Sequence, residues 1–328
     1  MANNKKYTLA TIIALLAVAA LLTGIIKVAD KTVPVVVEAK SEEWVAPSLY
    51  SDATLKGEER ALVIYGEDLV AHTAYYFGPK GTISHITNGM NCQNCHLGAG
   101  KNAWGNNYGA VASTYPKFRD RSGSIETIAK RVNDCFERSL NGTAIDTTSR
   151  EMKAIVTYIK WVGKDVEKGV VPENSGITKV PYLNRAADPQ KGLVVYESTC
   201  KSCHGAGGEG MMNPDGIGYA YPPLWGENSY NSGAGLFRLS RFAGYVKDNM
   251  PFQIATHQSP ALSNEEAWDV AAFVNSQPRP SKDLTGDWPD ISKKPIDHPF
   301  GPYADGFTES QHKYGPFQPI ADARKKKQ

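Results

Sequence analysis

Two pentapeptides, Cys92-Gln-Asn-Cys95-His96 and Cys200-Lys-Ser-Cys203-His204, decide the fold class of this chain. Each contains two cysteines separated by two residues, with a histidine directly after the second cysteine. In this pattern the two thiols add across the vinyl groups of one haem, and the histidine becomes an axial iron ligand. We therefore predict two covalently bound haem c groups, which are two one-electron centres.

Other uses of paired cysteines do not account for both motifs. A redox-active pair, or one half of a zinc site, requires no histidine directly after the second cysteine. A disulfide framework is typical of short secreted chains, whereas 328 residues can bury a hydrophobic core without cross-links. The two motifs therefore indicate haem attachment.

Charge and length limit the classes of function. The net formal charge is +2, from 36 Lys and Arg against 34 Asp and Glu. So weak an overall field does not indicate a nucleic-acid partner, and any site for an anion must be local. Without an N-terminal segment, roughly 290 residues remain, a length typical of two domains.

The N-terminal segment indicates export. Lys5 and Lys6 precede residues 8–26, nineteen positions without a charge, and Lys27 follows. This stretch is long for the apolar part of a signal peptide and close to the roughly 20 residues that span a bilayer. We predict that residues 1–34 are a signal peptide or, preferably, an uncleaved single-helix membrane anchor. The rest of the chain is then periplasmic, as haem c attachment also requires.

The remaining chain divides into four parts at changes of composition. A Gly-, Pro- and charge-rich linker separates the two haem motifs, and a proline-rich but aromatic segment follows the second domain. The boundaries that we expect are 35–163 for the haem 1 domain, 164–187 for the linker, 188–276 for the haem 2 domain and 277–328 for an irregular C-terminal arm on the protein surface.

Helical patterns follow both motifs. In the first domain, apolar residues recur at spacings of three and four over 124–140, and Thr148 begins a second helix that ends at Gly163. In the second domain, Asp188-Pro189 begins a helix, another covers 236–246, and Ser263 opens a third with a capping box. These patterns predict a mostly α fold with two cytochrome c-type haem domains in tandem.

The spacing of two sulfur-containing residues indicates a duplicated unit. Cys135, the cysteine that the motifs leave over, precedes Thr148 by 13 residues, and Met250 precedes Ser263 by the same 13. Cys135 and Met250 are therefore expected at equivalent places in two related domains.

Met250 is the expected second axial ligand of haem 2. It lies 46 residues after His204 and directly before a proline, in the loop that supplies the sixth ligand in single-haem cytochrome c domains. None of the other five methionines fits this role. One is the initiator, and the others lie too close to a haem motif or on an apolar helical face. Ligation by His and Met raises the reduction potential of a haem, which suits an exit point for electrons.

Cys135 is the expected second ligand of haem 1. On a helix, residues three and four positions away share its face, which places Arg131, Arg138 and Ser139 around the sulfur. Guanidinium groups favour the thiolate, which is the form that ligates iron and attacks electrophiles. The alternatives are a buried free thiol and bis-histidine ligation of haem 1 by His72 or His85.

Two segments around these residues resemble those of the dihaem thiosulfate dehydrogenases. They are Asn88-Gly-Met-Asn-Cys92-Gln-Asn-Cys95-His96-Leu97 and Arg131-Val-Asn-Asp-Cys135-Phe-Glu-Arg138-Ser139-Leu-Asn-Gly142. The similarity runs over most of the exported part of the chain. It implies His and Cys ligation of haem 1, and oxidation of two thiosulfates to tetrathionate with electron transfer to an external cytochrome or membrane acceptor.

The resemblance also assigns roles to single residues. Carried over by position, Cys135 is the catalytic sulfur, and Arg121, Arg131 and Ser139 line the substrate site. One position departs from the pattern. Some relatives have a lysine before the ligating methionine as an alternative ligand, and here that residue is Asn249.

Three other functions remain open at the level of sequence. A tetrathionate reductase would use the same site in reverse, and direction depends on haem potentials set by contacts that sequence does not show. A non-catalytic dihaem electron carrier would need no thiolate ligand. A cytochrome c peroxidase would need an open iron.

Overall fold

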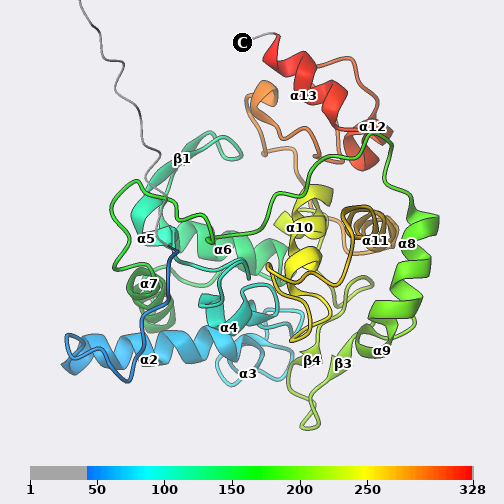
Figure 1. Ribbon diagram of the computed structural model, residues 1–328. Helices are drawn as coiled ribbons and strands as arrows, with labels where there is room; N and C mark the ends of the chain where they lie inside the picture. The colour runs from blue at the N-terminus through cyan, green and yellow to red at the C-terminus, as the bar shows by residue number, and fades with distance from the viewer. Residues whose placement is uncertain (1–42, 327–328) are drawn as a thin grey trace, which may run out of the picture. The chain divides into compact units, whose positions relative to one another are not determined.

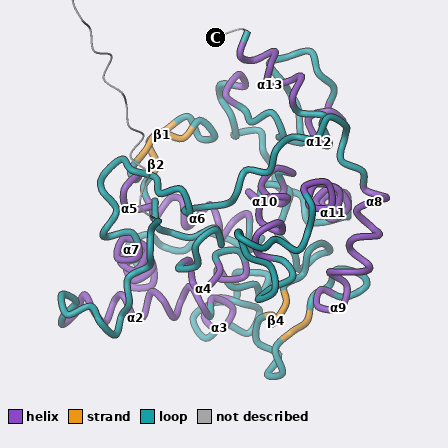
Figure 2. Tube along the Cα trace, in the orientation of Figure 1, coloured by secondary structure: helices purple, strands orange, loops and turns teal. Residues whose placement is uncertain are grey.

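The computed structural model describes residues 43–326, and most of their regular structure is helical (Figure 2). The strands form two short antiparallel pairs. β1 (Lys117–Arg119) pairs with β2 (Ser124–Glu126), and β3 (Met211–Met212) pairs with β4 (Tyr219–Tyr221). The mostly α fold class is thereby confirmed.

The first haem domain is built on two crossing helices, α2 and α7, which Figure 1 shows beside each other. Short helices connect them around the first motif. The helices of this domain are α2 (Gly57–Ala71), α3 (Thr73–Phe77), α4 (Leu97–Gly100), α5 (Val111–Thr114), α6 (Ile128–Arg138) and α7 (Arg150–Val162).

The second haem domain repeats this arrangement, because α8 and α10 both pack against α11. Its helices are α8 (Pro189–Val195), α9 (Lys201–His204), α10 (Leu239–Asn249) and α11 (Asn264–Ser276). A π-helical turn, Tyr196–Cys200, joins α8 to α9, so the second motif ends a nearly continuous helix. Asp188 caps α8, and the capping box of Ser263 is present, both as expected.

A glycine at each helix crossing shows that the two domains are related. At Gly66 of α2 a Cβ atom would overlap with the carbonyl oxygen of Ala154 in α7. At Gly192 of α8 a Cβ atom would overlap with the carbonyl oxygen of Asp269 in α11. Only glycine allows the backbones to approach this closely.

Each domain has its own hydrophobic core. The first includes Phe136, Met152 and Tyr158, and the second includes Tyr196, Phe242 and Trp268. Two separate cores agree with two haem domains, whose exact boundaries remain the predicted ones.

Several hydrogen bonds join the two domains. The Tyr245 hydroxyl donates to the Asn94 carbonyl (3.0 Å), and the Asn88 amide donates to the Ser229 carbonyl (3.1 Å). Asn231 donates through its side chain to the Glu137 carbonyl (2.8 Å), at the end of α6. The haem 2 domain therefore holds both the first motif and the C-terminal end of α6.

Two local predictions were wrong in detail. Residues 124–126 form β2 instead of the first turn of α6, which starts after the N-cap Thr127. The cap of α7 is Ser149, whose hydroxyl accepts from the Met152 amide, and not Thr148. The spacing from Cys135 to the helix cap is therefore one residue longer than the spacing from Met250.

The C-terminal arm is more regular than expected. It contains α12 (Glu309–Tyr314) and α13 (Gln318–Lys325), and Phe317 and Ile320 belong to the core of the second domain. Aromatic residues explain this, because Phe317 packs on the Trp268 ring. The first part of the arm, up to the 3₁₀ turn Ile291–Lys293, has no helix and crosses to the haem 1 domain.

The predicted signal or anchor, residues 1–34, lies outside the described residues. Within residues 43–326, no helix has the length and apolar character needed to cross a membrane.

Candidate functional site

Both motif histidines are held as iron ligands would be. The Nδ1 atom of His96 lies 2.5 Å from the Asn106 carbonyl oxygen, and that of His204 lies 2.8 Å from the Pro222 carbonyl oxygen. Such a bond places the proton on Nδ1 and leaves the Nε2 lone pair for a metal. Burial lowers the pKa of His96 to about 4, which keeps this ring neutral at ordinary pH.

A cavity of about 470 Å³ adjoins the second motif. Cys200, Cys203, His204 and Met250 all line it, and most of its wall is apolar. The apolar lining residues include Leu224, Leu236, Phe242, Val246, Leu262, Val270 and Val274. An apolar cavity with two thiols, an imidazole and a thioether fits one haem c group with His and Met as the available ligands.

Arg279 supports this fit. It lies over the Tyr230 ring and donates to the Leu224 carbonyl (3.2 Å), and both residues line the cavity. Its Nε–H is buried without a partner among residues 43–326. A buried donor without an acceptor indicates a missing anionic group, and haem carboxylates are of this kind.

The first motif lies next to the second. Asn94 and Cys95 line the same cavity as Cys200 and His204. Asn94 and Cys95 of the first motif therefore form part of the wall of the haem 2 cavity.

Asn249, which precedes Met250, is fully engaged in the fold. Its amide donates to the carbonyls of Tyr245 (2.9 Å) and Trp104 (3.2 Å), and the residue is buried. An amide held in this way has no role as an iron ligand, so Met250 is the available ligand in this loop.

Cys135 lies on α6 and faces the first motif. Its charge contributes to the raised pKa of Cys92 and of Cys95, in both cases after the larger effect of burial, which brings each to about 12. The Cys135 side chain is half-buried. The fold therefore places the Cys135 sulfur near Cys92 and Cys95.

Arg131 lies one turn before Cys135. The charge of Cys135 raises the pKa of Arg131 above its ordinary value, although burial opposes this effect. No side-chain hydrogen bond or ion pair joins the Arg131 guanidinium to the part of the chain that the structure describes. Arg131 is thus a cation whose charge remains available to an anion beside Cys135.

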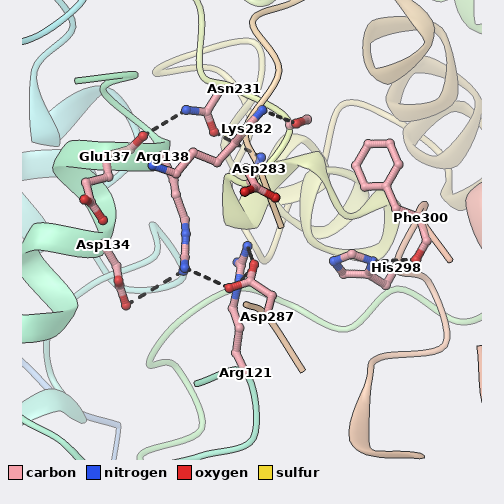
Figure 3. Close-up of polar contacts among 12 residues, drawn as sticks. Arg121, Asp134, Glu137, Arg138, Asn231, Lys282, Asp283, Asp287, His298 and Phe300 are labelled. Atoms are coloured by element: carbon pink, nitrogen blue, oxygen red, sulfur yellow. Dashed lines mark hydrogen bonds and ion pairs between the residues drawn. The ribbon is translucent and has the colours of Figure 1, made fainter. Parts of the chain in front are cut away.

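Arg121 and Arg138, in contrast, share one carboxylate. Figure 3 shows Asp287 of the C-terminal arm between their guanidinium groups. Arg121 donates to Asp287 Oδ2 at 2.7 and 2.9 Å, and Arg138 donates to Oδ1 at 3.1 Å. Arg138 also lies 3.8 Å from Asp134. Arg121 is therefore near the predicted site, but with a compensated charge.

Ser139 caps the end of α6. Its amide donates to the Cys135 carbonyl (2.8 Å), which fixes it one turn from the sulfur. The alternative ligands of haem 1, His72 and His85, both have solvent-exposed side chains. Exposed imidazoles are less suited to a buried haem than Cys135 is.

Two residues near the site were missed by the sequence analysis. Lys117 of β1 forms no ion pair within residues 43–326, and burial lowers its pKa, followed by the charges of Arg119 and Arg131. Asp287 is the second, and nothing in its sequence context distinguishes it from the other acidic residues of the arm.

Fold and site together define a class of protein, the dihaem c-type cytochromes. Residues 84–167 match the family model described as SoxA/TsdA, cytochrome c domain, and residues 189–278 match the model described as cytochrome c. The chain therefore carries two covalently bound haem c groups.

Relatives narrow this class to one family. The chain is 41% identical to thiosulfate dehydrogenase of Psychrobacter arcticus over 63% of its own length and 62% of that protein. It is 37% identical to thiosulfate dehydrogenase of Allochromatium vinosum over 68% of its own length and 82% of that protein. The chain belongs to the thiosulfate dehydrogenase family.

A solved structure agrees with this assignment. Thiosulfate dehydrogenase (TsdBA) from Marichromatium purpuratum, in its as-isolated form, superposes with a TM-score of 0.66 and 29% sequence identity. The match covers 78% of this chain and 52% of that one. This chain thus spans about half the length of the Marichromatium chain.

Proposed function

We propose that the protein oxidises two thiosulfate ions to tetrathionate at haem 1. In this proposal His96 and Cys135 are the ligands of haem 1, and His204 and Met250 are the ligands of haem 2. The electrons pass from haem 1 to haem 2 and then to an external cytochrome or membrane acceptor in the periplasm.

The position of Cys135 carries this proposal. A simple electron carrier needs neither a third sulfur beside the haem-binding cysteines nor a half-buried cation without a partner. Here α6 supplies both, Cys135 and Arg131, one turn apart. A fixed cation next to a nucleophilic sulfur suits a reaction that must bring two dianions together.

The reaction divides into two sulfur transfers. In the first, the Cys135 thiolate and one thiosulfate form a sulfur–sulfur bond and release two electrons, which leaves a cysteine S-thiosulfonate. In the second, another thiosulfate attacks that adduct, so that tetrathionate leaves and the thiolate is restored. No proton is consumed, and each step brings only one dianion to the sulfur.

The residues around Cys135 have separate tasks in this scheme. Arg131 attracts each thiosulfate, and Ser139, on the same face, can donate a hydrogen bond to a sulfonate oxygen. The two haem c groups would supply two one-electron acceptors for this reaction. Residues of both motifs line one cavity, which would keep the two groups close together.

Replacing Cys135 by alanine tests the proposal. We expect loss of thiosulfate-dependent reduction of an external cytochrome, while both haems stay attached to their own cysteines. Glu137→Gln is the matched control, because Glu137 lies on the same helix but two positions away, on another face. Wild-type turnover by Cys135→Ala would refute the role of this sulfur.

The direction in which the reaction runs needs a second measurement. The same residues would serve tetrathionate reduction, because every step is reversible. Steady-state rates with thiosulfate and an oxidised acceptor, compared with tetrathionate and a reduced donor, decide which direction the haem potentials favour.

A further inference from the structure

The C-terminal arm places a carboxylate next to the proposed thiosulfate site. Asp287 accepts two hydrogen bonds from Arg121 on Oδ2 and one from Arg138 on Oδ1 (Figure 3). All three side chains are largely buried, with 16% of Arg121, 15% of Arg138 and 11% of Asp287 exposed. Both oxygens of one carboxylate therefore hold two guanidinium groups that come from different parts of the haem 1 domain.

The arginines need this carboxylate because their charges repel each other. Burial lowers the pKa of Arg121, the hydrogen bonds that Arg121 donates to Asp287 oppose that effect, and the charge of Arg138 adds to the lowering. Without an anion between them, the two guanidinium groups would separate or turn toward water.

Backbone contacts fix the position of Asp287 itself. The amide of Trp288 donates to the Arg121 carbonyl at 2.7 Å. The next residue, Pro289, packs so closely on Gly123 that a Cβ atom there would lie 2.6 Å from the proline ring. The arm thus holds the loop of Arg121 at three consecutive residues.

These groups lie near the helix that carries the reacting sulfur of the proposed mechanism. Arg138 follows Cys135 by less than one turn of α6, and the charge of Arg131 also acts on Arg121. Within residues 43–326, Asp287 forms no hydrogen bond or ion pair with Cys135, so it can affect the reaction either through the two arginines or through its own charge.

We propose that Asp287 is a positioning residue that holds Arg121 and Arg138 for thiosulfate at Cys135. This inference rests on the proposed function. It gives the C-terminal arm a role in the active site, although the arm contributes no haem ligand.

The direction of the change in KM distinguishes a positioning role of Asp287 from a purely electrostatic role. Removing a negative charge near a site for dianions should strengthen substrate binding if only the field matters. Losing the positioned arginines should weaken binding, because small displacements of such groups are costly. The two explanations therefore predict opposite changes in KM.

Asp287→Asn tests this in the holoprotein. We expect the KM for thiosulfate to rise roughly tenfold, with both haem spectra unchanged. Asp287→Glu keeps the charge but moves it by one methylene, and we expect a smaller rise, so partial rescue. This variant also serves if the asparagine variant does not fold. An unchanged or lower KM in either variant would overturn the inference.

Asp297→Asn is the matched control for anchoring of the arm. Asp297 is a buried carboxylate of the same arm, and it accepts hydrogen bonds from Arg238 (2.9 Å) and Ser240 instead of from Arg121 or Arg138. We expect this variant to lower the Tm and leave the KM unchanged. If Asp297→Asn raised the KM as much as Asp287→Asn does, Asp287 would only hold the arm in place, and the inference would be overturned. Absence of thiosulfate turnover in the unaltered protein would instead refute the proposed function and this inference with it.

Discussion

At the scale of the residue, the structure separates two kinds of arginine around Cys135. Arg121 and Arg138 are paired with Asp287, whereas Arg131 has no ion pair with a carboxylate in residues 43–326. Only an uncompensated cation offers its full charge to a substrate. All three arginines looked alike in the sequence, because the partner of two of them lies about 150 positions further along the chain.

Arg131→Gln should therefore weaken thiosulfate binding more than changes at neighbouring cations. A hydrogen bond to a charged group contributes about 2 kcal/mol, so the KM should rise about 30-fold. Arg131→Lys should give an intermediate KM, because lysine keeps the positive charge but lacks the planar guanidinium group that can donate two parallel hydrogen bonds. Steady-state kinetics with intact haem spectra provide the measurement.

Lys130→Gln is the control for this change. Lys130 is adjacent to Arg131 but points to solvent and pairs with Asp134 at 2.5 Å. We expect its KM to stay within about twofold of the original value. Equal rises in KM for Arg131→Gln and Lys130→Gln would indicate that thiosulfate responds to the overall positive charge and not to a specific contact with Arg131.

At the scale of the element, each haem domain depends on one close helix crossing. Gly66 allows α2 to lie against α7, and Gly192 allows α8 to lie against α11. These crossings set the distance between the first and last helices of each domain. The sequence analysis found the helices from their apolar periodicity but could not identify which glycines lie at contacts.

Gly66→Ala should destabilise the protein although alanine favours helices. Overpacking at the Ala154 carbonyl costs about 3 kcal/mol, and the higher helix propensity returns about 1 kcal/mol. The expected net loss in the free energy of unfolding is about 2 kcal/mol, measured by denaturant titration. Gly286→Ala is the control, because no atom lies within 4 Å of the added Cβ. Equal stability of the two variants would contradict the crossing model.

At the scale of the whole molecule, the haem 2 cavity is a structural requirement as well as a redox site. Its volume is about 470 Å³, and walls from both domains line it. Without haem, the apolar residues that line this cavity would be exposed to water, which is unfavourable. We therefore expect the fold of the second domain to depend on its haem.

A Cys200→Ser, Cys203→Ser double variant, which cannot attach haem 2, should fail to form the native second domain. We expect trypsin to cleave the second domain of this variant, and we expect its helical circular dichroism signal to decrease. Cys135→Ser is the control, because it also removes sulfur but leaves haem attachment intact. A native, protease-resistant double variant would show that the cavity collapses or fills without haem.

Much of the candidate site was predictable from sequence because its signals are local. The haem motifs are contiguous, and Arg131, Cys135 and Ser139 lie on one face of one helix, so helical geometry alone brings them together. Arg121 was assigned only by family resemblance. Its actual neighbour, Asp287, was not predictable, since the pairing depends on how the C-terminal arm crosses the haem 1 domain.

The sequence by itself determined the number of haems and the helical class of the fold, and it predicted the attachment residues and a role for Cys135 at haem 1. Each of these depends on residues close together in the chain, whose geometry follows from bond lengths and helical repeat. Only the tertiary structure decided which arginines are neutralised, which glycines lie at helix crossings and that the arm reaches the site. Those contacts join residues far apart in sequence, and their positions depend on how two hydrophobic cores pack.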